Sequence, residues 1–203
     1  ASYQNTALAS VLNYPLFFTL RGCFAYGNSL YQLQDVIQQI NTSFPDPTIL
    51  GTFLDNHDQV RFLSITSDLQ LYKAGLTFVL MHQGIPIVYY GSEQAFNGKD
   101  DPYNREPLWS NPTGFNQQAD LYQFISKVAT FRKQVAISQY NQIQRYADDH
   151  FYAFTRGPYF VALTNVGSSG PQLRRTITYH PYQDGQKLCN LFWPVDDCVT
   201  VAQ

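Results

Sequence analysis

Residues 48–58 read TILGTFLDNHD, an apolar run that ends abruptly in a dense cluster of polar side chains. Runs rich in β-branched and aromatic residues indicate strands, so we expect a buried strand over residues 48–54. A strand normally fades into Gly, Pro or Ser turn residues, whereas this one delivers Asp55, His57 and Asp58 to one point. Strand ends of this kind form the active-site mouths of parallel α/β folds.

The composition excludes several classes of partner. The chain has 203 residues, enough for one large or two small domains, and a formal net charge of -2. It has no basic stripe interleaved with aromatic residues, which argues against nucleic-acid binding. It also has no apolar run of about 18 residues, so we expect no membrane span. Aromatic residues make up 16% and charged residues only 14%, a balance found where sugars stack on rings, although most of these rings should serve the core.

Cysteine spacing and one sequon point to a secreted protein. Cys189 and Cys198 lie nine residues apart in a strand-rich tail and could pair in an oxidising compartment, which leaves Cys23 over. Asn41 opens the sequon Asn41-Thr42-Ser43, a weak signal by itself that agrees with secretion. The opening residues, ASYQN, resemble the middle of a longer polypeptide.

Apolar periodicity predicts strands that alternate with helices. We expect strands within 9–20, 48–54 and 85–90, and helices over 30–41, 68–83 and 120–135. The run 85–90 is apolar throughout, as in a parallel strand covered on both faces. The polar strand tips at Asp58 and Glu93 lie 35 residues apart, close to the roughly 31 residues per unit of a (β/α)₈ barrel. Periodicity alone also allows a small doubly wound sheet.

The period changes after about residue 138. Short strand-like runs separated by Gly and Pro turns follow, at residues 151–154, 159–163, 173–179, 188–192 and 199–202. They predict a small antiparallel β domain.

Four segments in order resemble one family. VLNYP at 11–15, FLDNHD at 53–58, GIPIVYYGSEQ at 84–94 and DPYNRE at 101–106 are similar to the sixth, seventh and eighth barrel strands, and the loop after the eighth, of secreted fungal-type α-amylases. These belong to the retaining α-glucan hydrolases and transglycosylases of glycoside hydrolase family 13. The resemblance implies an α/β fold: the last three β/α units of a TIM (β/α)₈ barrel over 1–137, followed by a small antiparallel β-sandwich domain over 138–203.

The resemblance also implies site residues. Asp58 would be the third catalytic carboxylate, which hydrogen-bonds the 2- and 3-hydroxyls of the sugar being cleaved, bonds that strengthen in the transition state. His57 would donate to the same sugar, and Asp101 and Arg105 would hold the next one outward, because a carboxylate and a guanidinium fork both suit vicinal hydroxyls. The structural alternatives are a turn-capping Asp58, a core His57 and a loop salt bridge between Asp101 and Arg105.

Other polar residues have plainer interpretations. We interpret Asp55 and Arg61 as structural supports of the strand tip. For Glu93 two interpretations stay open: a buried residue that anchors its surroundings by hydrogen bonds, or a residue at the rim of the site. The cluster DDH at 148–150 could bind a metal, but its position in a turn favours a solvated loop.

Retaining glycosidases need two further carboxyl groups, a nucleophile and an acid/base. In the resembled family these groups come from the fourth and fifth strands, so no residue of this chain is assigned to them. A structural Ca²⁺ is expected in the parent enzyme, with ligands mostly outside this chain, and no metal ligand is assigned here. The expected partners are an α-glucan or maltooligosaccharide substrate and the N-terminal part of the same barrel, in the same or a separate chain.

The resulting hypothesis is endohydrolysis of α-1,4-glucosidic bonds in starch-type glucans with retention. An α-glucosidase or a transglycosylase of the same family is the near alternative. A non-catalytic glucan-binding or interaction relative is a second class, against which the intact pair His57 and Asp58 argues. A free-standing binding module is a third class. Without the five other strands of the barrel, the strand edges of such a module would remain unpaired, which argues against it.

Overall fold

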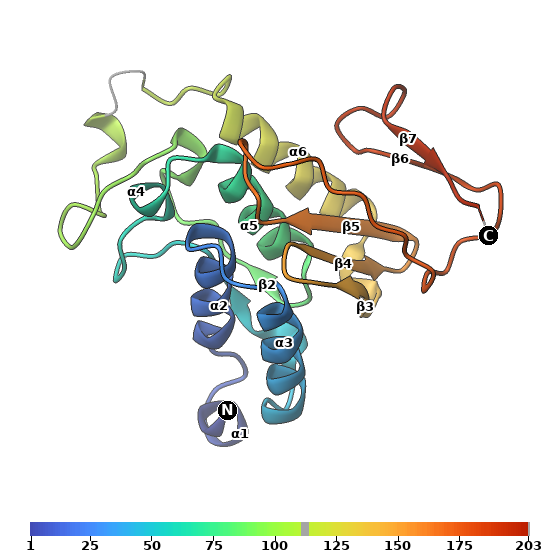
Figure 1. Cartoon of the computed structure of the whole chain (residues 1–203). Helices are drawn as coiled ribbons and strands as arrows, with labels where there is room; N and C mark the ends of the chain where they lie inside the picture. Colours follow the sequence, from blue (N-terminus) through green and yellow to red (C-terminus); the bar gives the residue numbers. More distant parts are fainter. Residues whose placement is uncertain (111–113, 203) are drawn as a thin grey trace.

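The computed structural model describes residues 1–110 and 114–202, in which helices and short strands follow one another from a blue N-terminus to a red C-terminus (Figure 1). The α-helices are α1 (Ser2–Thr6), α2 (Tyr14–Ala25), α3 (Tyr31–Ser43), α4 (Phe62–Ile65), α5 (Leu69–Met81) and α6 (Asp120–Gln134). The strands are β1 (Gly51–Thr52), β2 (Ile85–Pro86), β3 (Gln142–Ala147), β4 (Phe151–Arg156), β5 (Tyr159–Thr164), β6 (Lys187–Cys189) and β7 (Cys198–Thr200). Single 3₁₀ turns lie at Pro47–Ile49, Ser92–Gln94, Leu108–Ser110 and Ile137–Gln139.

Three extended segments lie side by side in parallel. β1 pairs with β2 in the register Gly51 to Ile85, and Leu12 forms a parallel bridge to Gly51 from the other side. The backbone N–H of Ile87 continues the ladder by donating to the Thr52 carbonyl at 2.7 Å. The order along the sheet therefore follows the order along the chain, as in an arc of a barrel. The arc does not close in this chain, and the regular strands span only two residues each, fewer than predicted for 48–54 and 85–90.

The predicted strand within 9–20 is wrong beyond Leu12, because helix α2 begins at Tyr14. Asn13 caps this helix by accepting a hydrogen bond from the Leu16 N–H at 3.2 Å, and Pro15 lies in its first turn. Both residues favour a helix start, since the cap satisfies a free N–H and proline has none to satisfy. The apolar side chains that follow serve a buried helix face instead of a strand.

The parallel arc leaves large apolar side chains exposed on both of its outer segments. Ile85 is 52% exposed, and Ile87, Val88 and Leu12 are also among the exposed large hydrophobic residues. The expectation that the run 85–90 is covered on both faces is therefore wrong for this chain. A parallel strand buries both faces only when the neighbouring strands and helices of its sheet are present.

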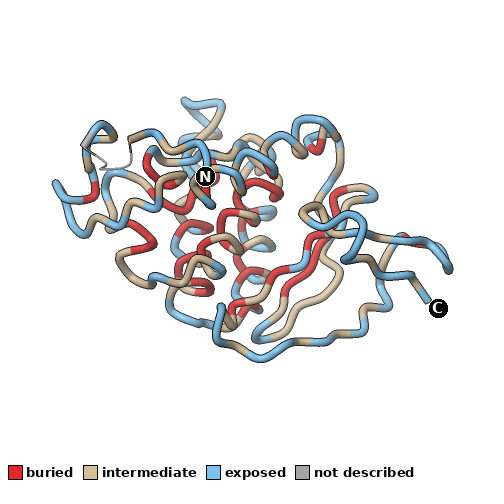
Figure 2. The backbone as a smooth tube through the Cα atoms, turned by 90° about the horizontal axis from the view of Figure 1, so that it is seen from above, coloured by how far each residue is buried: buried red, intermediate tan, exposed pale blue. Residues whose placement is uncertain are grey.

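The helices predicted over 30–41, 68–83 and 120–135 are confirmed as α3, α5 and α6. Helix α5 begins where the Asp68 side chain accepts from the N–H groups of Gln70 and Leu71. It contacts α2, α6 and β5, and its Phe78 packs against Phe154 of β4. One continuous core thus joins the helices to the β region, and Figure 2 shows the buried residues gathered there.

The C-terminal region holds two separate antiparallel sheets. The first has the order β3-β4-β5, and the second is the β6-β7 hairpin. Strand β3 was not predicted, the run 173–179 forms no regular strand, and the described residues do not assemble the sandwich that the resemblance implied. The hairpin lies beside α6, where Phe192 stacks on Phe124 at 5.1 Å between ring centroids. A domain boundary between residues 137 and 138 stays a prediction.

The predicted disulfide between Cys189 and Cys198 is confirmed and joins paired positions of the hairpin. Cys23 is free and buried, and burial raises the pKa of its thiol to about 12. Within the described part of the chain, no helix combines the length and apolar character that crossing a bilayer requires.

Two arginines, the buried Arg156 and the half-buried Arg132, join the end of α5 to the β region. Arg156 of β4 donates to the carbonyls of Met81, Ile137 and Tyr140 at 2.7–3.0 Å, and Arg132 of α6 donates to the Leu80 carbonyl at 2.6 Å. Free carbonyls at a helix C-terminus attract such donors, because they carry the negative end of the helix dipole.

His82 follows directly after α5 and is 2% exposed. Its Nδ1 lies 2.7 Å from the Gln142 side-chain oxygen. Burial lowers its pKa to about 3. The Gln142 hydrogen bond opposes this shift, and the charges of Arg156 and Arg132 add smaller lowering effects. The imidazole is therefore neutral near pH 7.

Candidate functional site

Asp55 anchors the segment that leaves β1. Its carboxylate is buried and accepts from the Phe62 N–H and the Tyr72 hydroxyl, both at 2.6 Å, while Arg21 lies 3.9 Å away. Burial raises the pKa of Asp55, against the hydrogen bonds from Tyr72 and Phe62 and the nearby arginines, which favour the charged form. All of its contacts are internal, which confirms the interpretation of Asp55 as a structural support.

Asp58 and His57 lie together at the exposed tip of this segment. Their side chains are 51% and 63% exposed, with 3.2 Å between the imidazole Nε2 and the carboxylate Oδ1. The Tyr14 hydroxyl lies 3.4 Å from Oδ2 of Asp58 and itself accepts from the Asn56 amide at 3.0 Å. A core histidine would be buried, so the exposure of His57 contradicts that alternative.

The carboxylate of Asp58 does not act as a turn cap. Within the described residues its recorded partners are the side chains of His57 and Tyr14, with no backbone N–H among them. The turn is held instead by Asn56, whose side-chain oxygen accepts from the Asp58 N–H at 3.1 Å. The acidic oxygens of Asp58 therefore remain available to a ligand from solvent.

The loop after β2 brings Asp101 and Arg105 next to this tip. They form an ion pair at 3.2 Å, and Nε of Arg105 also donates to the His57 carbonyl at 3.1 Å. Both side chains are about half exposed. The loop salt bridge considered from the sequence therefore exists, and it lies beside the strand tip with solvent-facing atoms. Sugar binding by this pair stays a prediction.

Arg61 is fully buried beneath the two loops. Its Nε donates to Glu106 at 2.6 Å, its Nη1 donates to the Tyr90 carbonyl at 2.9 Å, and its guanidinium lies 4.4 Å from the centre of the Tyr89 ring. A guanidinium that stacks on a ring and donates in several directions holds its surroundings rigidly. The structural interpretation of Arg61 is confirmed.

Glu93 lies half-buried in the turn Ser92–Gln94, and no hydrogen bond or ion pair of its carboxylate is recorded in the described structure. It therefore does not act as a hydrogen-bond anchor within the described part of this chain.

The sequon residue Asn41 lies exposed near the end of α3, where its side-chain oxygen accepts from Gln83 at 2.8 Å. Its glycosylation stays a prediction.

The cluster at 148–150 is a turn between β3 and β4, as expected. Asp148 accepts from the N–H groups of His150 and Phe151, both at 2.8 Å, and pairs with Arg175. Among all described residues, no group of three His, Cys, Asp or Glu side chains is placed to hold a metal ion.

Sequence reasoning did not assign a role to Tyr14, Asn104 or Glu106, although each contacts the site. Tyr14 belongs to the VLNYP segment, while Asn104 and Glu106 belong to the DPYNRE segment. Their position at strand and loop ends was a usable signal. The sequence did not reveal that Tyr14 and Asn104 form hydrogen bonds to the segment around Asp58, or that Glu106 pairs with the buried Arg61 beneath it.

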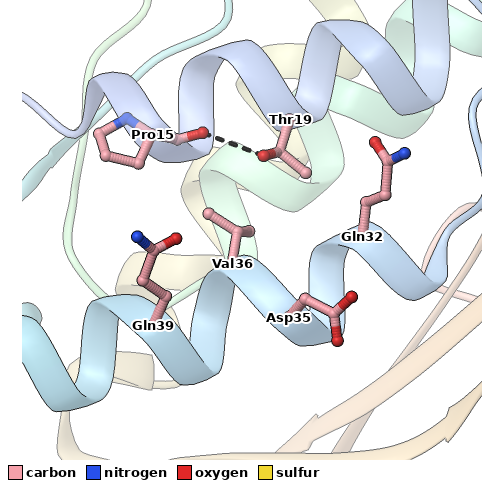
Figure 3. Close-up of a pocket in the computed structure, with 6 residues that line it drawn as sticks. All are labelled: Pro15, Thr19, Gln32, Asp35, Val36 and Gln39. Carbon is pink, nitrogen blue, oxygen red and sulfur yellow. Dashed lines mark hydrogen bonds between the residues drawn. The ribbon is translucent and has the colours of Figure 1, made fainter.

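A groove elsewhere does not share this chemistry. It lies between α2 and α3 and is lined by Pro15, Thr19, Gln32, Asp35, Val36 and Gln39 (Figure 3). The Thr19 hydroxyl is used within the helix, where it donates to the Pro15 carbonyl at 3.0 Å. Asp35 is the one ionisable side chain among these lining residues, so the groove lacks the combination of acid, imidazole and guanidinium found around Asp58.

Comparisons with known proteins point in one direction. The family model described as the α-amylase catalytic domain matches residues 3–153. An α-amylase of Saccharomycopsis fibuligera is 38% identical over 208 residues, covering 98% of this chain and 40% of that protein. The solved structure of an α-amylase from Malbranchea cinnamomea superposes with a TM-score of 0.90 at 33% identity, covering 99% of this chain and 43% of that one.

A cyclomaltodextrin glucanotransferase structure is also similar, with a TM-score of 0.69 at 30% identity over 75% of this chain and 31% of that one. The chain thus spans about two fifths of the length of the α-amylases that it matches.

Proposed function

The chain belongs to the α-amylase family, and we propose that the complete protein containing it hydrolyses α-1,4-glucosidic bonds within starch-type glucans, with retention of configuration. Asp58 stabilises the transition state, and His57 binds the same sugar. Asp101 and Arg105 hold the neighbouring sugar. The nucleophile and the acid/base carboxyl groups come from residues outside this chain.

One observation carries this proposal: Asp58 stands solvent-exposed at the end of a parallel strand, with its oxygens free of backbone donors. A carboxylate in that state can accept hydrogen bonds from two vicinal hydroxyls. Such bonds strengthen as the sugar ring distorts toward an oxocarbenium ion. The imidazole of His57 lies 3.2 Å from the Asp58 carboxylate, and the guanidinium of Arg105 donates to the His57 carbonyl. Both groups can donate to further hydroxyls.

The exposed apolar side chains of the arc support a partner for the barrel part. Ile85, Ile87, Val88 and Leu12 present apolar side chains where a closed barrel buries them. We propose that the N-terminal part of the same barrel covers these side chains, in the same or a separate polypeptide. A structural Ca²⁺ in that enzyme would take its ligands mostly from there, and the described residues of this chain hold no group of three His, Cys, Asp or Glu side chains that could bind a metal ion.

The disulfide in the β6–β7 hairpin supports secretion, because such bonds persist in oxidising compartments. Glycosylation at Asn41 belongs to the same proposal.

The test uses the complete protein with soluble starch and with linear maltooligosaccharides. The expected result is a mixture of internal cleavage products whose new reducing ends appear first as the α-anomer in time-resolved NMR. A β-anomer would contradict retention. Binding without release of reducing ends would contradict the enzymatic role and favour the glucan-binding relative.

The similarity to a cyclomaltodextrin glucanotransferase keeps transglycosylation as a second candidate. Cyclic or elongated products in the same NMR and chromatographic assay would identify it. Release of glucose alone from chain ends would identify an α-glucosidase.

A further inference from the structure

Asn104 joins the loop after β2 to the backbone on both sides of Asp58. We propose that Asn104 is a positioning residue, which orients the Asp58 carboxylate by fixing the main chain that carries it. The proposal rests on the catalytic role proposed above for Asp58. Asn104 itself is 0% exposed and does not reach solvent or substrate.

The Asn104 side chain holds the main chain through two hydrogen bonds, an arrangement that we call the clamp. The side-chain nitrogen of Asn104 donates to the His57 carbonyl at 3.0 Å and to the Gln59 carbonyl at 2.9 Å. A primary amide has two N–H donors, and here each one has its own acceptor. The two acceptors lie one residue before and one residue after Asp58. They hold the peptide unit directly before Asp58, between His57 and Asp58, and the unit between Gln59 and Val60.

The direction of the amide follows from the same contacts. A flipped side chain would place the Asn104 oxygen against the carbonyl oxygens of His57 and Gln59, which is repulsive. In the observed direction the oxygen is buried without a recorded partner in the described structure. Leaving a buried acceptor unpaired costs free energy, so the site retains the amide despite that cost.

The clamp is not redundant. The His57 carbonyl also accepts from Arg105, whereas the only recorded donor to the Gln59 carbonyl, within the described residues, is Asn104. Removing the amide would therefore free the C-terminal side of Asp58 in particular.

The loop that carries Asn104 is itself rigid. Glu106 accepts from the Gly98 N–H and from Arg61, both at 2.6 Å, and the Gly98 carbonyl accepts from the Arg61 N–H at 3.0 Å. A Cβ at Gly98 would lie 1.8 Å from the carbonyl oxygen of Tyr103, so only glycine allows this close approach. Through its two hydrogen bonds, Asn104 thus ties the Asp58 segment to a loop that is held in place by its own contacts.

The test is a double-mutant cycle in the complete enzyme. We measure kcat and KM on starch for Asn104→Leu, Asp58→Asn and the double variant, with Asn97→Asp as the matched control. Leucine fills a similar volume without donors, and Asn97 is exposed on the same stretch of chain. Displacement of a catalytic group by about 1 Å is worth on the order of 100-fold in rate.

We therefore expect Asn104→Leu to lower kcat by about 10- to 100-fold with KM changed less than about threefold. In the Asp58→Asn background the same change should lower the residual kcat by less than about twofold, since groups that act as one unit are non-additive. Equal losses in both backgrounds would overturn positioning through Asp58 and leave only a structural role.

The two proposals fail in different ways. Near wild-type kcat for Asp58→Asn would refute the proposed function itself. A large loss for Asp58→Asn with an unchanged Asn104→Leu would refute the positioning role alone. If Asn104→Leu does not fold, Asn104→Ser replaces it, because a water molecule can then occupy the space and partly restore both hydrogen bonds. The crystal structure of that variant shows whether a water molecule is ordered between the two carbonyls. If none is ordered and kcat equals the wild-type value, the proposal is overturned.

Discussion

The strand tip around Asp58 and the junction at the end of α5 use the same kinds of side chain for opposite purposes. At the tip, His57 is 63% exposed and lies beside a carboxylate, whereas at the junction His82 is 2% exposed and lies beside two arginines. The first histidine has a free face for a ligand, and the second has none. Exposure and the charge of the neighbours, rather than residue type, separate a binding group from a structural one.

The arginines show the same contrast. Arg105 keeps half of its surface in solvent and shares its Nε between Asp101 and a main-chain carbonyl. Arg156 is buried and donates all of its recorded hydrogen bonds to main-chain carbonyls. We therefore expect changes at the tip to affect activity and changes at the junction to affect stability. Four predictions test this distinction.

The largest expected effect belongs to Asp58→Asn in the complete enzyme. Loss of the charge weakens hydrogen bonds that strengthen in the transition state, so kcat on starch should fall by about 1000-fold, equivalent to roughly 4 kcal/mol. The unfolding temperature should stay within about 2 °C, because the side chain is half exposed. Asp149→Asn, an exposed aspartate in the β3–β4 turn, is the control. Comparable losses in both variants would refute a specific role for Asp58.

The second prediction concerns stability at the junction. Arg156→Met removes the donors to Met81, Ile137 and Tyr140 and leaves their carbonyls buried, so the free energy of unfolding should fall by about 3 kcal/mol. Chemical denaturation monitored by circular dichroism gives this value. The exposed Arg174→Met should change it by less than about 0.5 kcal/mol. A similarly small change for Arg156→Met would show that its hydrogen bonds do not contribute to the free energy of unfolding.

The third prediction concerns acid stability. The pKa of His82 is about 3 in the folded state and about 6.5 when unfolded, so below pH 6.5 the unfolded state binds the extra proton. Stability is therefore full above pH 6.5 and is lost as the pH falls toward 3, by about 2 kcal/mol at pH 5. His82→Gln should remove that slope in denaturation curves between pH 7 and 5. The exposed His150→Gln should retain it, and an unchanged slope in His82→Gln would contradict the assignment.

The smallest effect is expected from Arg105→Ala. Loss of one charged donor to a sugar hydroxyl should raise KM for maltooligosaccharides about 10-fold and leave kcat within about threefold. Arg105→Lys should recover only part of the binding, because lysine lacks the planar fork. An unaltered KM in both variants would indicate that the ion pair with Asp101 is purely structural.

The amino-acid sequence was sufficient to predict the helices over 31–43, 69–81 and 120–134, because each has an apolar face at helical spacing. It also determined the disulfide of the hairpin and the family, since four short segments carry the residues of the strand tips. It did not determine the start of α2. There the cap at Asn13 and the proline after it outweighed an apolar run that is equally compatible with a strand.

Which polar residues work together depends on the three-dimensional packing of the loops. The hydrogen bonds from Asn104 to the flanks of Asp58, and from Tyr14 to its carboxylate, join residues more than 40 positions apart in the chain. Pairing over such distances depends on how two loops pack, which no local pattern of residues encodes. For the same reason, the exposed edge at Ile85 became visible only once the strands were placed in space.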